Sequence, residues 1–410
     1  MGIIVQKYGG TSVKNTERIM NAARLAVKEK EAGHQVVVVV SAMAGETDRL
    51  LNLANEIDPA GSPRERDMLA SAGEQVSIAL LSMAIQTLGH KAVSYTGPQI
   101  GIRTDASFTK AKIQSIDDLK FKDAFRDDKI VVVAGFQGVT ENHEITTFGR
   151  GGSDTTAVAI AAVLKADRCD IYTDVDGVYA ADPRIVPRAK KIPALAYEEM
   201  LEMASMGAKV LHTRSVQFAA KYNVPLQVLS SIEDKPGTMI TKEVKSMENV
   251  VVSSVTHSSR EAKVTLSQIA DKPGTAAALF KYLAEQNINV DMIVQNVGEK
   301  GLADISFTVE RTDLPYLKKR ESELLSFIQA GGIKYDDRIA KISIIGVGMR
   351  SHAGVAYRMF ERLAQKGINI LMISTSEIKV SCVIHDEYTE LAVRTLCEEF
   401  ELENGEAVTA

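Results

Sequence analysis

The sequence predicts a layered α/β domain followed by two smaller α+β modules. Unbroken apolar runs such as residues 36–40, which are all valine, are typical of strands buried on both faces, and they alternate with helical patterns over residues 1–240. The second half repeats itself at a constant offset of 80 residues, which indicates two copies of one module. At 410 residues the chain is also too long for one ordinary core.

The elements of the first half follow this alternation. Buried-strand patterns occur at residues 3–6, 36–40, 130–134 and 169–172. Between the first two strands, Asn15 caps a predicted helix and Gly33 ends it. Polar turns rich in Gly, Ser, Thr or Asp follow the strands at residues 9–12, 41–48, 135–138 and 173–177. Because ligands of open α/β sheets bind at the carboxyl ends of strands, we expect these turns to face one crevice.

A polar stretch over residues 230–247 marks the boundary between the two halves. The predicted divisions are a first domain over residues 1–240, a linker over 241–262, and modules over 263–335 and 340–403. Eight residues between positions 274 and 293 recur between positions 354 and 373. Each module reads strand, Gly turn, helix, break and strand, as in a βαβ-type α+β unit.

The composition indicates a soluble globular protein without a nucleic-acid surface. The net charge is −5, the hydrophobic content is 45%, and the sequence has no dense Lys/Arg tract. No apolar run approaches the about 18 residues that a membrane span needs, and we expect no signal peptide. Cys169, Cys382 and Cys397 lack metal or redox spacing, so we interpret them as buried thiols of a cytoplasmic protein.

The segment of residues 148–157 has the residue types of an anion-binding turn. Gly151 and Gly152 let the backbone approach a bound group, and Arg150 offers a planar fork for a carboxylate or phosphate. Ser153 and Asp154 then open an apolar helical run whose first N–H groups favour anions. From this segment alone, a tight loop with a solvated arginine is the alternative.

A second turn suits a phosphate group. Lys7 ends the first strand just before Gly9 and Gly10, so an ammonium stands beside a turn of glycines and hydroxyls. The lysine comes before the glycines, which excludes the P-loop pattern.

Three further side chains are candidates for contacting a ligand. Ser41 and Thr47 follow the second buried strand and offer hydroxyl groups. Glu74 lies in an otherwise apolar helical stretch, where it accepts a substrate ammonium or serves as a surface or capping residue.

The segment of residues 172–184 combines aromatic, acidic and basic residues after a strand. This combination suits the base, ribose and phosphates of a nucleotide, and Lys209 is a further candidate phosphate cation. The acids within the segment lack the third acid and the distant Glu of a calcium loop.

Taken in order along the chain, these motifs resemble those of the aspartokinase family. The matching motifs are KYGGTSV at residues 7–13, SAM at 41–43 with Thr47, GEQ at 73–75, GRGGSDTT at 149–156 and YTDVDGVY at 172–179. The tandem repeat resembles the paired ACT domains of that family, and residues 343–380 resemble the second ACT domain of its lysine-pathway members.

The resemblance implies a fold and an activity. The fold is the amino acid kinase fold, an open and mainly parallel sheet with helices on both faces, followed by two α+β ACT modules. The activity is transfer of the γ-phosphoryl group of ATP to the side-chain carboxylate of L-aspartate, with Mg²⁺ bridging the phosphates. The product is 4-phospho-L-aspartate, the first intermediate toward lysine, threonine and methionine.

The resemblance also assigns roles to the matching residues. Lys7 is expected to neutralise the transferring phosphoryl group, and Asp154 to orient Lys7 or the metal. Arg150 is expected to clamp a carboxylate of aspartate and Glu74 to receive its ammonium; no general base is needed, because the nucleophile is already ionised. The other substrate-binding candidates are Ser41, Thr47, Gly151, Gly152 and Ser153. The ATP-binding candidates are Lys7, Gly9, Gly10, Thr173, Asp174, Tyr179, Arg184 and Lys209.

Paired ACT domains imply feedback inhibition by lysine, threonine or both. The expected effector-binding residues are Asp271, Ala276, Asn289, Val290, Asp291, Gln295, Asn369, Ile370 and Ser376. Such modules bind effectors between paired copies, so we expect a homo-oligomer, or an α₂β₂ assembly with a shorter regulatory subunit that starts near Met247.

Two departures from the family and three rival interpretations complete the prediction. Thr213 stands where the family usually has proline, and Leu229 where it usually has arginine, which puts effector coupling in more doubt than catalysis. The rivals are a kinase of acetylglutamate or glutamate, a catalytically inactive amino-acid sensor, and a fused aspartokinase–homoserine dehydrogenase. The ACT pair, the intact charged set and the lack of a dinucleotide glycine pattern argue against these three in turn.

Overall fold

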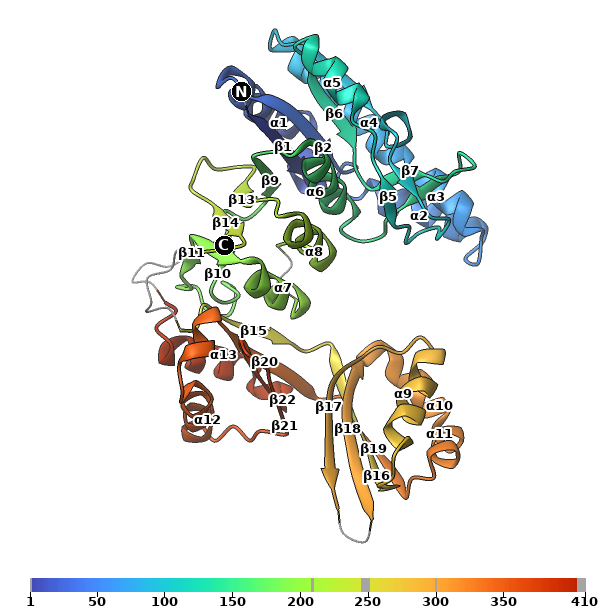
Figure 1. Ribbon diagram of the computed structural model, residues 1–410, viewed down its shortest axis with the longest axis vertical. Helices are drawn as coiled ribbons and strands as arrows, with labels where there is room; N and C mark the ends of the chain where they lie inside the picture. Colours follow the sequence, from blue (N-terminus) through green and yellow to red (C-terminus); the bar gives the residue numbers. More distant parts are fainter. Residues whose placement is uncertain (1, 208–209, 245–250, 299–300, 404–410) are drawn as a thin grey trace. The chain divides into compact units, whose positions relative to one another are not determined.

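The computed structural model describes residues 2–207, 210–244, 251–298 and 301–403. The chain forms two compact units, Met1–Val178 with Lys191–Lys245 and Tyr179–Lys190 with Ser246–Ala410. Figure 1 shows both units, coloured along the sequence. The chain leaves the first unit at β10 (Val178–Tyr179) and re-enters it at β11 (Lys191–Ile192).

The first unit is built on an eight-stranded sheet with the order β12-β14-β13-β9-β1-β2-β6-β3. The strands are β1 (Ile3–Tyr8), β2 (Gln35–Val40), β3 (Ala92–Tyr95), β6 (Ile130–Ala134), β9 (Arg168–Thr173), β12 (Ala194–Ala196), β13 (Leu226–Ser230) and β14 (Thr238–Thr241). From β3 to β13 every neighbouring pair is parallel, and β14 is antiparallel to β13. This mainly parallel sheet confirms the predicted α/β class.

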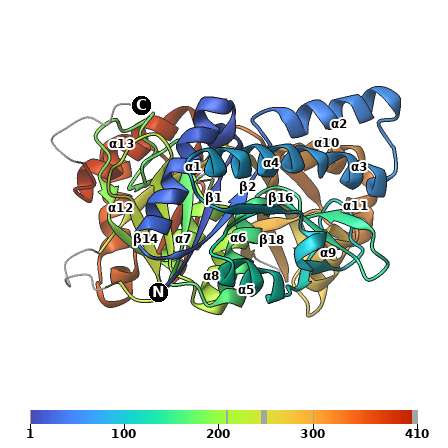
Figure 2. The same cartoon turned by 90° about the horizontal axis from the view of Figure 1, so that it is seen from above.

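Helices cover both faces of this sheet. Val36, Val38 and Val40 pack into a cluster with α1 (Thr16–Glu31) and α4 (Ala72–Thr87), which lie side by side on one face (Figure 2). Successive side chains of a strand point to opposite faces, so the fully buried Val37 and Val39 point away from that cluster. The helix α6 (Gly152–Leu164) packs on β1, β2 and β9, and this two-sided burial explains the unbroken valine run.

Smaller elements complete the first unit. A four-stranded sheet with the order β5-β4-β7-β8 consists of β4 (Arg103–Thr104), β5 (Ile113–Ser115), β7 (Gln137–Val139) and β8 (Ile145–Thr147). The remaining helices are α2 (Glu46–Ile57), α3 (Pro63–Ala70), α5 (Leu119–Arg126), α7 (Tyr197–Ser205) and α8 (Thr213–Tyr222), with the 3₁₀ turns η1 (Gly10–Val13) and η2 (Pro98–Ile100). The Asn15 side chain caps α1 by accepting from the Arg18 N–H, as the sequence predicts.

The helices α3 and α4 follow one another with only Ser71 between them, and α4 is largely apolar. Among the described residues, Pro63–Thr87 alone has the length and composition of a membrane span, although we expected no run of that length from the sequence. Its most apolar window is 56% buried in the protein. Ile78, Leu81 and Ile85 belong to the core cluster under the sheet, so packing within the first unit accounts for the composition of this helix.

The second unit contains two four-stranded antiparallel sheets. The first has the order β17-β18-β16-β19 and consists of β16 (Glu261–Ala270), β17 (Val290–Val297), β18 (Leu302–Glu310) and β19 (Gly332–Asp336). The second has the order β15-β20-β22-β21 and consists of β15 (Ser254–Ser258), β20 (Ile339–Ile345), β21 (Met372–Thr375) and β22 (Lys379–His385). The helical elements are α9 (Thr275–Glu285), η3 (Arg311–Asp313), α10 (Leu314–Lys319), α11 (Glu321–Ile328), η4 (Val347–Ser351), α12 (Val355–Gln365), η5 (Asp386–Tyr388) and α13 (Thr389–Glu399).

The strand β15 lies within the segment that we assigned from sequence to a linker, residues 241–262. It pairs antiparallel with β20, from Ser254 opposite Ile345 to Ser258 opposite Lys341. In the first module, β16 has partners on both sides, β18 and β19. The second module has no strand after α13 in the described chain up to residue 403, so β15 satisfies the N–H and C=O groups of β20 that β22 leaves unpaired.

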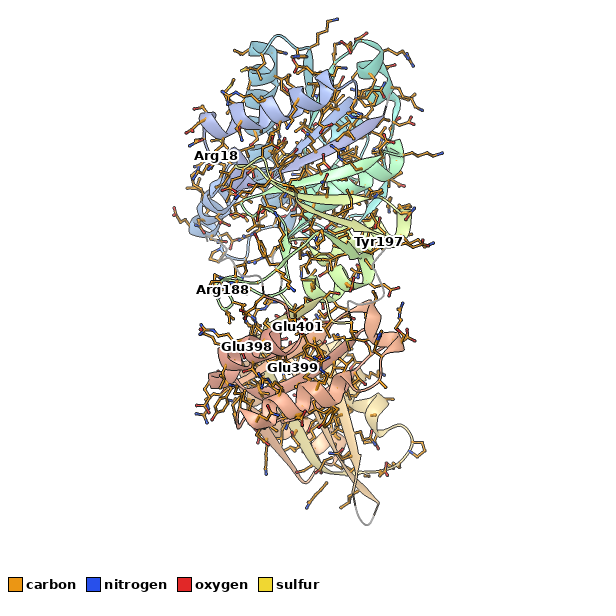
Figure 3. The ribbon with its side chains drawn as sticks, turned by 90° about the vertical axis from the view of Figure 1, so that its left-hand side faces the viewer. Arg18, Arg188, Tyr197, Glu398, Glu399 and Glu401 are labelled. Atoms are coloured by element: carbon orange, nitrogen blue, oxygen red, sulfur yellow. The ribbon has the colours of Figure 1, made fainter. Side chains whose placement is uncertain are left out.

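Side-chain contacts join elements within the second unit. Arg358 and Arg362 of α12 form ion pairs with Glu398 and Glu399 of α13, two acids that Figure 3 labels.

Where the two modules meet, the buried Lys341 of β20 forms ion pairs with Glu261, at 2.6 Å, and with Asp291. Because Glu261 and Asp291 belong to the first module, these charges tie the two sheets together.

We expect Leu81→Ala to destabilise the first unit by about 2–5 kcal/mol, because it opens a cavity beneath the sheet. Met83, two residues along the same helix and 61% exposed, provides the control. Met83→Ala should change the free energy of unfolding by no more than about 0.5 kcal/mol. Urea unfolding followed by circular dichroism measures both; equal effects would contradict the packing of α4 described here.

Candidate active site and effector pocket

A cavity of about 640 Å³ lies in the first unit, where β1, β2 and β6 end. Its walls come from the turns after these strands, from α3 and α4, and from the start of α6. The lining residues predicted from sequence are Lys7, Gly9, Gly10, Ser41, Thr47, Glu74, Arg150, Gly151, Gly152, Ser153 and Asp154. The structure therefore gathers the predicted aspartate-binding and catalytic residues around one cavity.

An ion pair lies in the wall of this cavity. Lys7 Nζ lies 2.6 Å from Asp154 Oδ1, and each side chain is only about one-tenth exposed. Asp154 belongs to the first turn of α6, where the free N–H groups and the helix dipole favour negative charge. The same features attract a bound anion, so the cavity offers an ammonium and a helix N-terminus to a phosphate.

The turn before α6 requires glycine at two positions. Gly149 and Gly151 have φ values of +72° and +69°, in the left-handed region. A Cβ atom on Gly151 would lie 2.2 Å from the His212 ring, so only glycine fits there. Between them, Arg150 is exposed at the cavity, and no ion pair joins it to the residues that the structure describes.

Glu74 is a buried carboxylate with one oxygen that lacks a partner. Oε1 accepts a hydrogen bond from the Ala42 N–H at 3.1 Å, whereas Oε2 is buried without one. The residue is 2% exposed, and burial raises the pKa of its carboxyl group from 4.5 to about 7. An unpaired buried acceptor that lines a cavity suits an ammonium donor, and the alternative of a surface glutamate is wrong.

The sequence prediction missed several residues of the cavity wall. They are Arg66, Asp67, Thr109, Phe136 and Thr147. Thr109 and Phe136 have positive φ values, 67° and 70°, which are uncommon for residues other than glycine. One signal in the sequence was available: Asp67 precedes Glu74 by seven residues, a spacing that places both acids on one helix face.

Two of the predicted ATP-binding residues, Thr173 and Asp174, lie at the carboxyl end of β9, outside the lining of this cavity. Tyr8 of β1 pairs in register with Tyr172 of β9, so Gly9 and Thr173 follow on adjacent strands. The Thr173 carbonyl accepts from the Ser231 N–H and hydroxyl, and the Thr173 hydroxyl bonds to Asp174.

Two further ATP-binding candidates lie outside the first unit. Tyr179 and Arg184 belong to the second unit, where the exposed Arg184 pairs with Asp182 at 2.6 Å. Lys209 lies outside the described residues.

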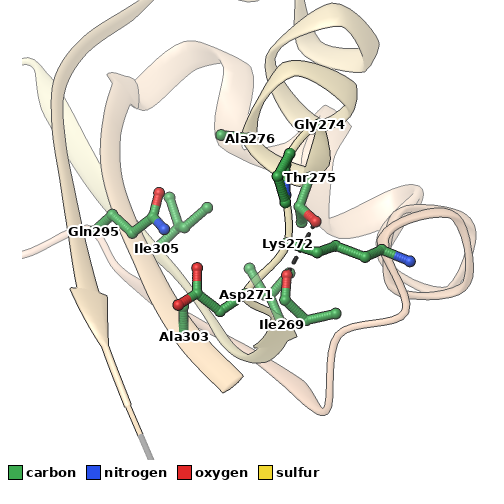
Figure 4. Close-up of a pocket in the computed structure, with 11 residues that line it drawn as sticks. Ile269, Asp271, Lys272, Gly274, Thr275, Ala276, Gln295, Ala303 and Ile305 are labelled. Atoms are coloured by element: carbon green, nitrogen blue, oxygen red, sulfur yellow. Dashed lines mark hydrogen bonds between the residues drawn. The ribbon is translucent and has the colours of Figure 1, made fainter. Parts of the chain in front are cut away.

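A second cavity, of about 350 Å³, lies in the first module of the second unit (Figure 4). It is bounded by the end of β16, the start of α9 and strands β17 and β18. Three predicted effector residues, Asp271, Ala276 and Gln295, line it. Gly274 has a φ of +98° at the N-terminal end of α9, which turns the chain around the cavity.

The other predicted effector residues lie elsewhere in the second unit. Asn289 and Val290 are outside the lining of this cavity, and Asp291 forms its ion pair with Lys341. Asn369, Ile370 and Ser376 belong to the second module and do not line the cavity either. The structure thus divides the predicted effector set between two modules.

Comparison with known proteins identifies the family. The amino acid kinase family model matches residues 2–230, and ACT domain models match residues 264–327 and 342–400. The aspartokinase of Pseudomonas aeruginosa is 55% identical over 407 residues, which cover 98% of each chain. The chain belongs to the aspartokinase family. As a member of the aspartokinases it is a phosphotransferase with two C-terminal ACT domains, which confirms the resemblance seen in the sequence.

Two solved aspartokinase structures share its fold. E. coli aspartokinase III in complex with aspartate and ADP, in the R-state, is 26% identical with a TM-score of 0.81. The same enzyme in complex with lysine and aspartate, in the T-state, is 27% identical with a TM-score of 0.75. Each match covers 97% of this chain and 99% of that aspartokinase chain.

We expect Glu74→Gln to stabilise the first unit at pH 8. A carboxyl group whose pKa is higher in the folded state loses stability as the pH rises from 4.5 to about 7. This shift corresponds to roughly 3 kcal/mol, so the free energy of unfolding should rise by about 2–3 kcal/mol at pH 8 and by little at pH 4.5.

Urea unfolding of both proteins at the two pH values measures this difference. The matched control is Glu56→Gln, which neutralises an exposed glutamate of α2 outside the cavity. A gain for Glu74→Gln that is the same at both pH values would show that burial of the charge is not its cause.

Proposed function

We propose that the chain transfers the γ-phosphoryl group of ATP to the side-chain carboxylate of L-aspartate, giving 4-phospho-L-aspartate. This product is the first intermediate toward lysine, threonine and methionine. One observation carries the proposal: the Lys7–Asp154 pair and the unpartnered oxygen of Glu74 line the same cavity. The complex of E. coli aspartokinase III with aspartate and ADP supports it.

The charged groups divide the two ends of aspartate between them. Glu74 Oε2 receives the ammonium group, and Arg150, at the glycine turn, binds a carboxylate through its planar fork. Ser41, Thr47 and Ser153 line the same cavity and offer hydroxyl donors. Since Glu74 must be ionised to attract the ammonium, aspartate binding should weaken as the pH falls through about 7.

The phosphoryl group is transferred in front of Lys7. The substrate carboxylate and the ATP phosphates are both negative, so the protein must offset their repulsion. Lys7 neutralises charge on the transferring group, and Asp154 holds the ammonium in place. Gly9, Gly10 and the start of α6 line the same cavity and offer backbone N–H donors. The aspartate carboxylate is already ionised at neutral pH, so the site needs no general base.

The donor set fits a magnesium ion that arrives with ATP. Mg²⁺ usually binds one or two protein carboxylates together with substrate phosphates, and Asp154 is the carboxylate beside Lys7. The described residues contain no group of three or more acidic, His or Cys side chains that would form a separate metal site. When bound, Mg²⁺ supplies additional positive charge to the phosphate oxygens.

The proposed nucleotide contacts extend from this cavity along the sheet edge. Thr173 ends β9 and Asp174 follows it, on the strand next to the one that leads into the Gly9 turn, and we assign to them contacts with the ribose or base of ATP. Tyr179, Arg184 and Lys209 remain proposals from the family resemblance.

We further propose that lysine, threonine or both inhibit the enzyme through the ACT domains, in a homo-oligomer. The complex of E. coli aspartokinase III with lysine supports this, as does the cavity that contains Asp271 and Gln295. An α₂β₂ assembly with a subunit that starts near Met247 is the alternative, and Met247 lies outside the described residues. We place the protein in the cytoplasm, where its three buried, unpaired cysteines stay reduced.

The activity is tested by trapping the acyl phosphate with hydroxylamine in the presence of ATP, Mg²⁺ and aspartate. Arg150→Met should raise the KM for aspartate by about 10–100-fold, because it removes a charge-assisted hydrogen-bond donor. The control is Arg126→Met, which removes an exposed arginine on α5 outside the cavity. If the native chain forms no hydroxamate that depends on aspartate, the proposed activity is wrong.

Regulation is tested by titrating the same assay with lysine, with threonine and with their mixture. Asp271→Asn should weaken inhibition by the active effector by about tenfold or more, since a charged acceptor for its ammonium is lost. Asp337→Asn changes an exposed acid outside the cavity and should leave inhibition unaltered. Inhibition that is equally strong in Asp271→Asn would contradict an effector site in this cavity.

A further inference from the structure

Asp67 is a buried acid in the wall of the active-site cavity with no role in the proposed chemistry. It is 1% exposed, on α3, and both of its oxygens are occupied. Oδ2 accepts from the N–H groups of Thr109 and Thr147, at 2.8 and 2.9 Å, and Oδ1 accepts from the Thr147 hydroxyl at 2.6 Å. The carboxylate therefore makes structural contacts rather than offering a free oxygen to a ligand.

These bonds hold the strand that leads into the glycine turn. Thr147 is the last residue of β8, two residues before Gly149. Its carbonyl accepts from the Ala111 N–H at 2.9 Å, which ties it to the segment of Thr109. From the other side, the Arg214 guanidinium donates to the carbonyls of Ala111, at 2.9 Å, and Phe148, at 3.1 Å. The base of the turn is thus held between a buried acid and a half-buried arginine.

Asp67 of α3 and Glu74 of α4 lie on one helical stretch. The stretch Pro63–Thr87 runs as one helix, and α3 continues α4 in Figure 2. Seven residues are close to two turns, so the two carboxylates share a face and stand about 10 Å apart along the axis. Glu74 bonds to Ala42 after β2, whereas Asp67 bonds to the end of β8. The helix is therefore fixed at both sides of the cavity.

We propose that Asp67 is a positioning residue that sets the distance between Glu74 and the turn that carries Arg150. This role rests on the proposed function, in which these two side chains bind opposite ends of the amino acid. The separation of an ammonium site from a carboxylate site determines the length of substrate that reaches both. Asp67 thereby favours aspartate over an acid that is one methylene longer.

The chemistry of the site favours this role over simple packing. A buried carboxylate is costly, and an apolar residue of similar size is often equally stabilising or better. A carboxylate, however, fixes three donors from two segments in directions that an apolar side chain leaves undefined. Small displacements matter here, because a shift of about 1 Å costs an enzyme up to 100-fold in rate.

The test compares Asp67→Ala and Asp67→Asn in the hydroxamate assay. Asp67→Ala leaves three donors without a partner and should raise the KM for aspartate by about tenfold or more, with the KM for ATP changed less than about twofold. It should also lower the ratio of kcat/KM for aspartate to that for glutamate. Asp67→Asn should restore values within about threefold of the native ones, because its oxygen accepts both N–H groups and its amide donates to the Thr147 hydroxyl.

Two further variants separate positioning from general destabilisation. Thr147→Val removes one of the three bonds at nearly constant volume, and should raise the KM for aspartate by about threefold even if Asp67→Ala does not fold. Glu199→Ala removes a different buried carboxylate, which accepts from the Ala196 N–H at 3.1 Å outside the cavity. It should lower the melting temperature without changing either KM.

Hydrogen exchange of residues 147–152 gives a readout that does not depend on activity. We expect exchange to be faster in Asp67→Ala or Thr147→Val than in the native chain, and unchanged in Glu199→Ala. If the native chain is inactive toward aspartate, the proposed function is wrong, whereas hydrogen exchange still tests whether Asp67 restrains residues 147–152. Unchanged exchange, or a melting temperature that falls while KM and the aspartate-to-glutamate ratio stay constant, would overturn the positioning role.

Discussion

The ion pair between Lys7 and Asp154 is the contact around which the first unit is arranged. It joins the end of β1, a strand in the middle of the sheet, to the first turn of α6. Burying either charge without a partner would cost free energy, and each residue offsets that cost for the other. In the proposed reaction both substrates are anions, so the Lys7 ammonium must remain able to contact them while it is paired with a protein carboxylate. Asp154 balances the Lys7 ammonium, while the glycine turns leave space beside it.

Glu74 is a buried carboxylate of the cavity that is only partly hydrogen-bonded. Glu74 uses one oxygen to hold Ala42 and leaves the second buried without a partner. Burial removes the ionised carboxylate from water, and the cost of this desolvation raises the pKa of the group. In the proposed function, the substrate ammonium pairs with this second oxygen, so substrate binding offsets the cost of burying the carboxylate.

The sequence predicts the fold well because its signals are local. The valine run of β2 and the cap at Asn15 each depend on neighbouring residues, and the structure agrees with both. The internal repeat is visible directly as recurring residues, and it agrees with the two four-stranded sheets of the second unit. The residues of the glycine turn were found for the same reason. Asp67 and Thr147 were missed because they are 80 positions apart and become partners only when α3 packs on β8. The ion pair of Asp291 with Lys341 is similarly non-local, and Asp291 does not line the cavity that contains Asp271.

The strand β15 makes the regulatory region topologically indivisible. Although the two modules are repeats, the second contains residues from both sides of the first, so the first module is inserted into the second. A fragment that begins after Ser258 would carry the whole repeat yet leave one edge of β20 unpaired and prone to association. Ordering of the second sheet also requires contacts between residues more than 80 positions apart, such as Thr256 with Ser343, which predicts that it forms late in folding. The two modules therefore exist as one folding unit, and any shorter regulatory chain has to include the segment that looks like a linker.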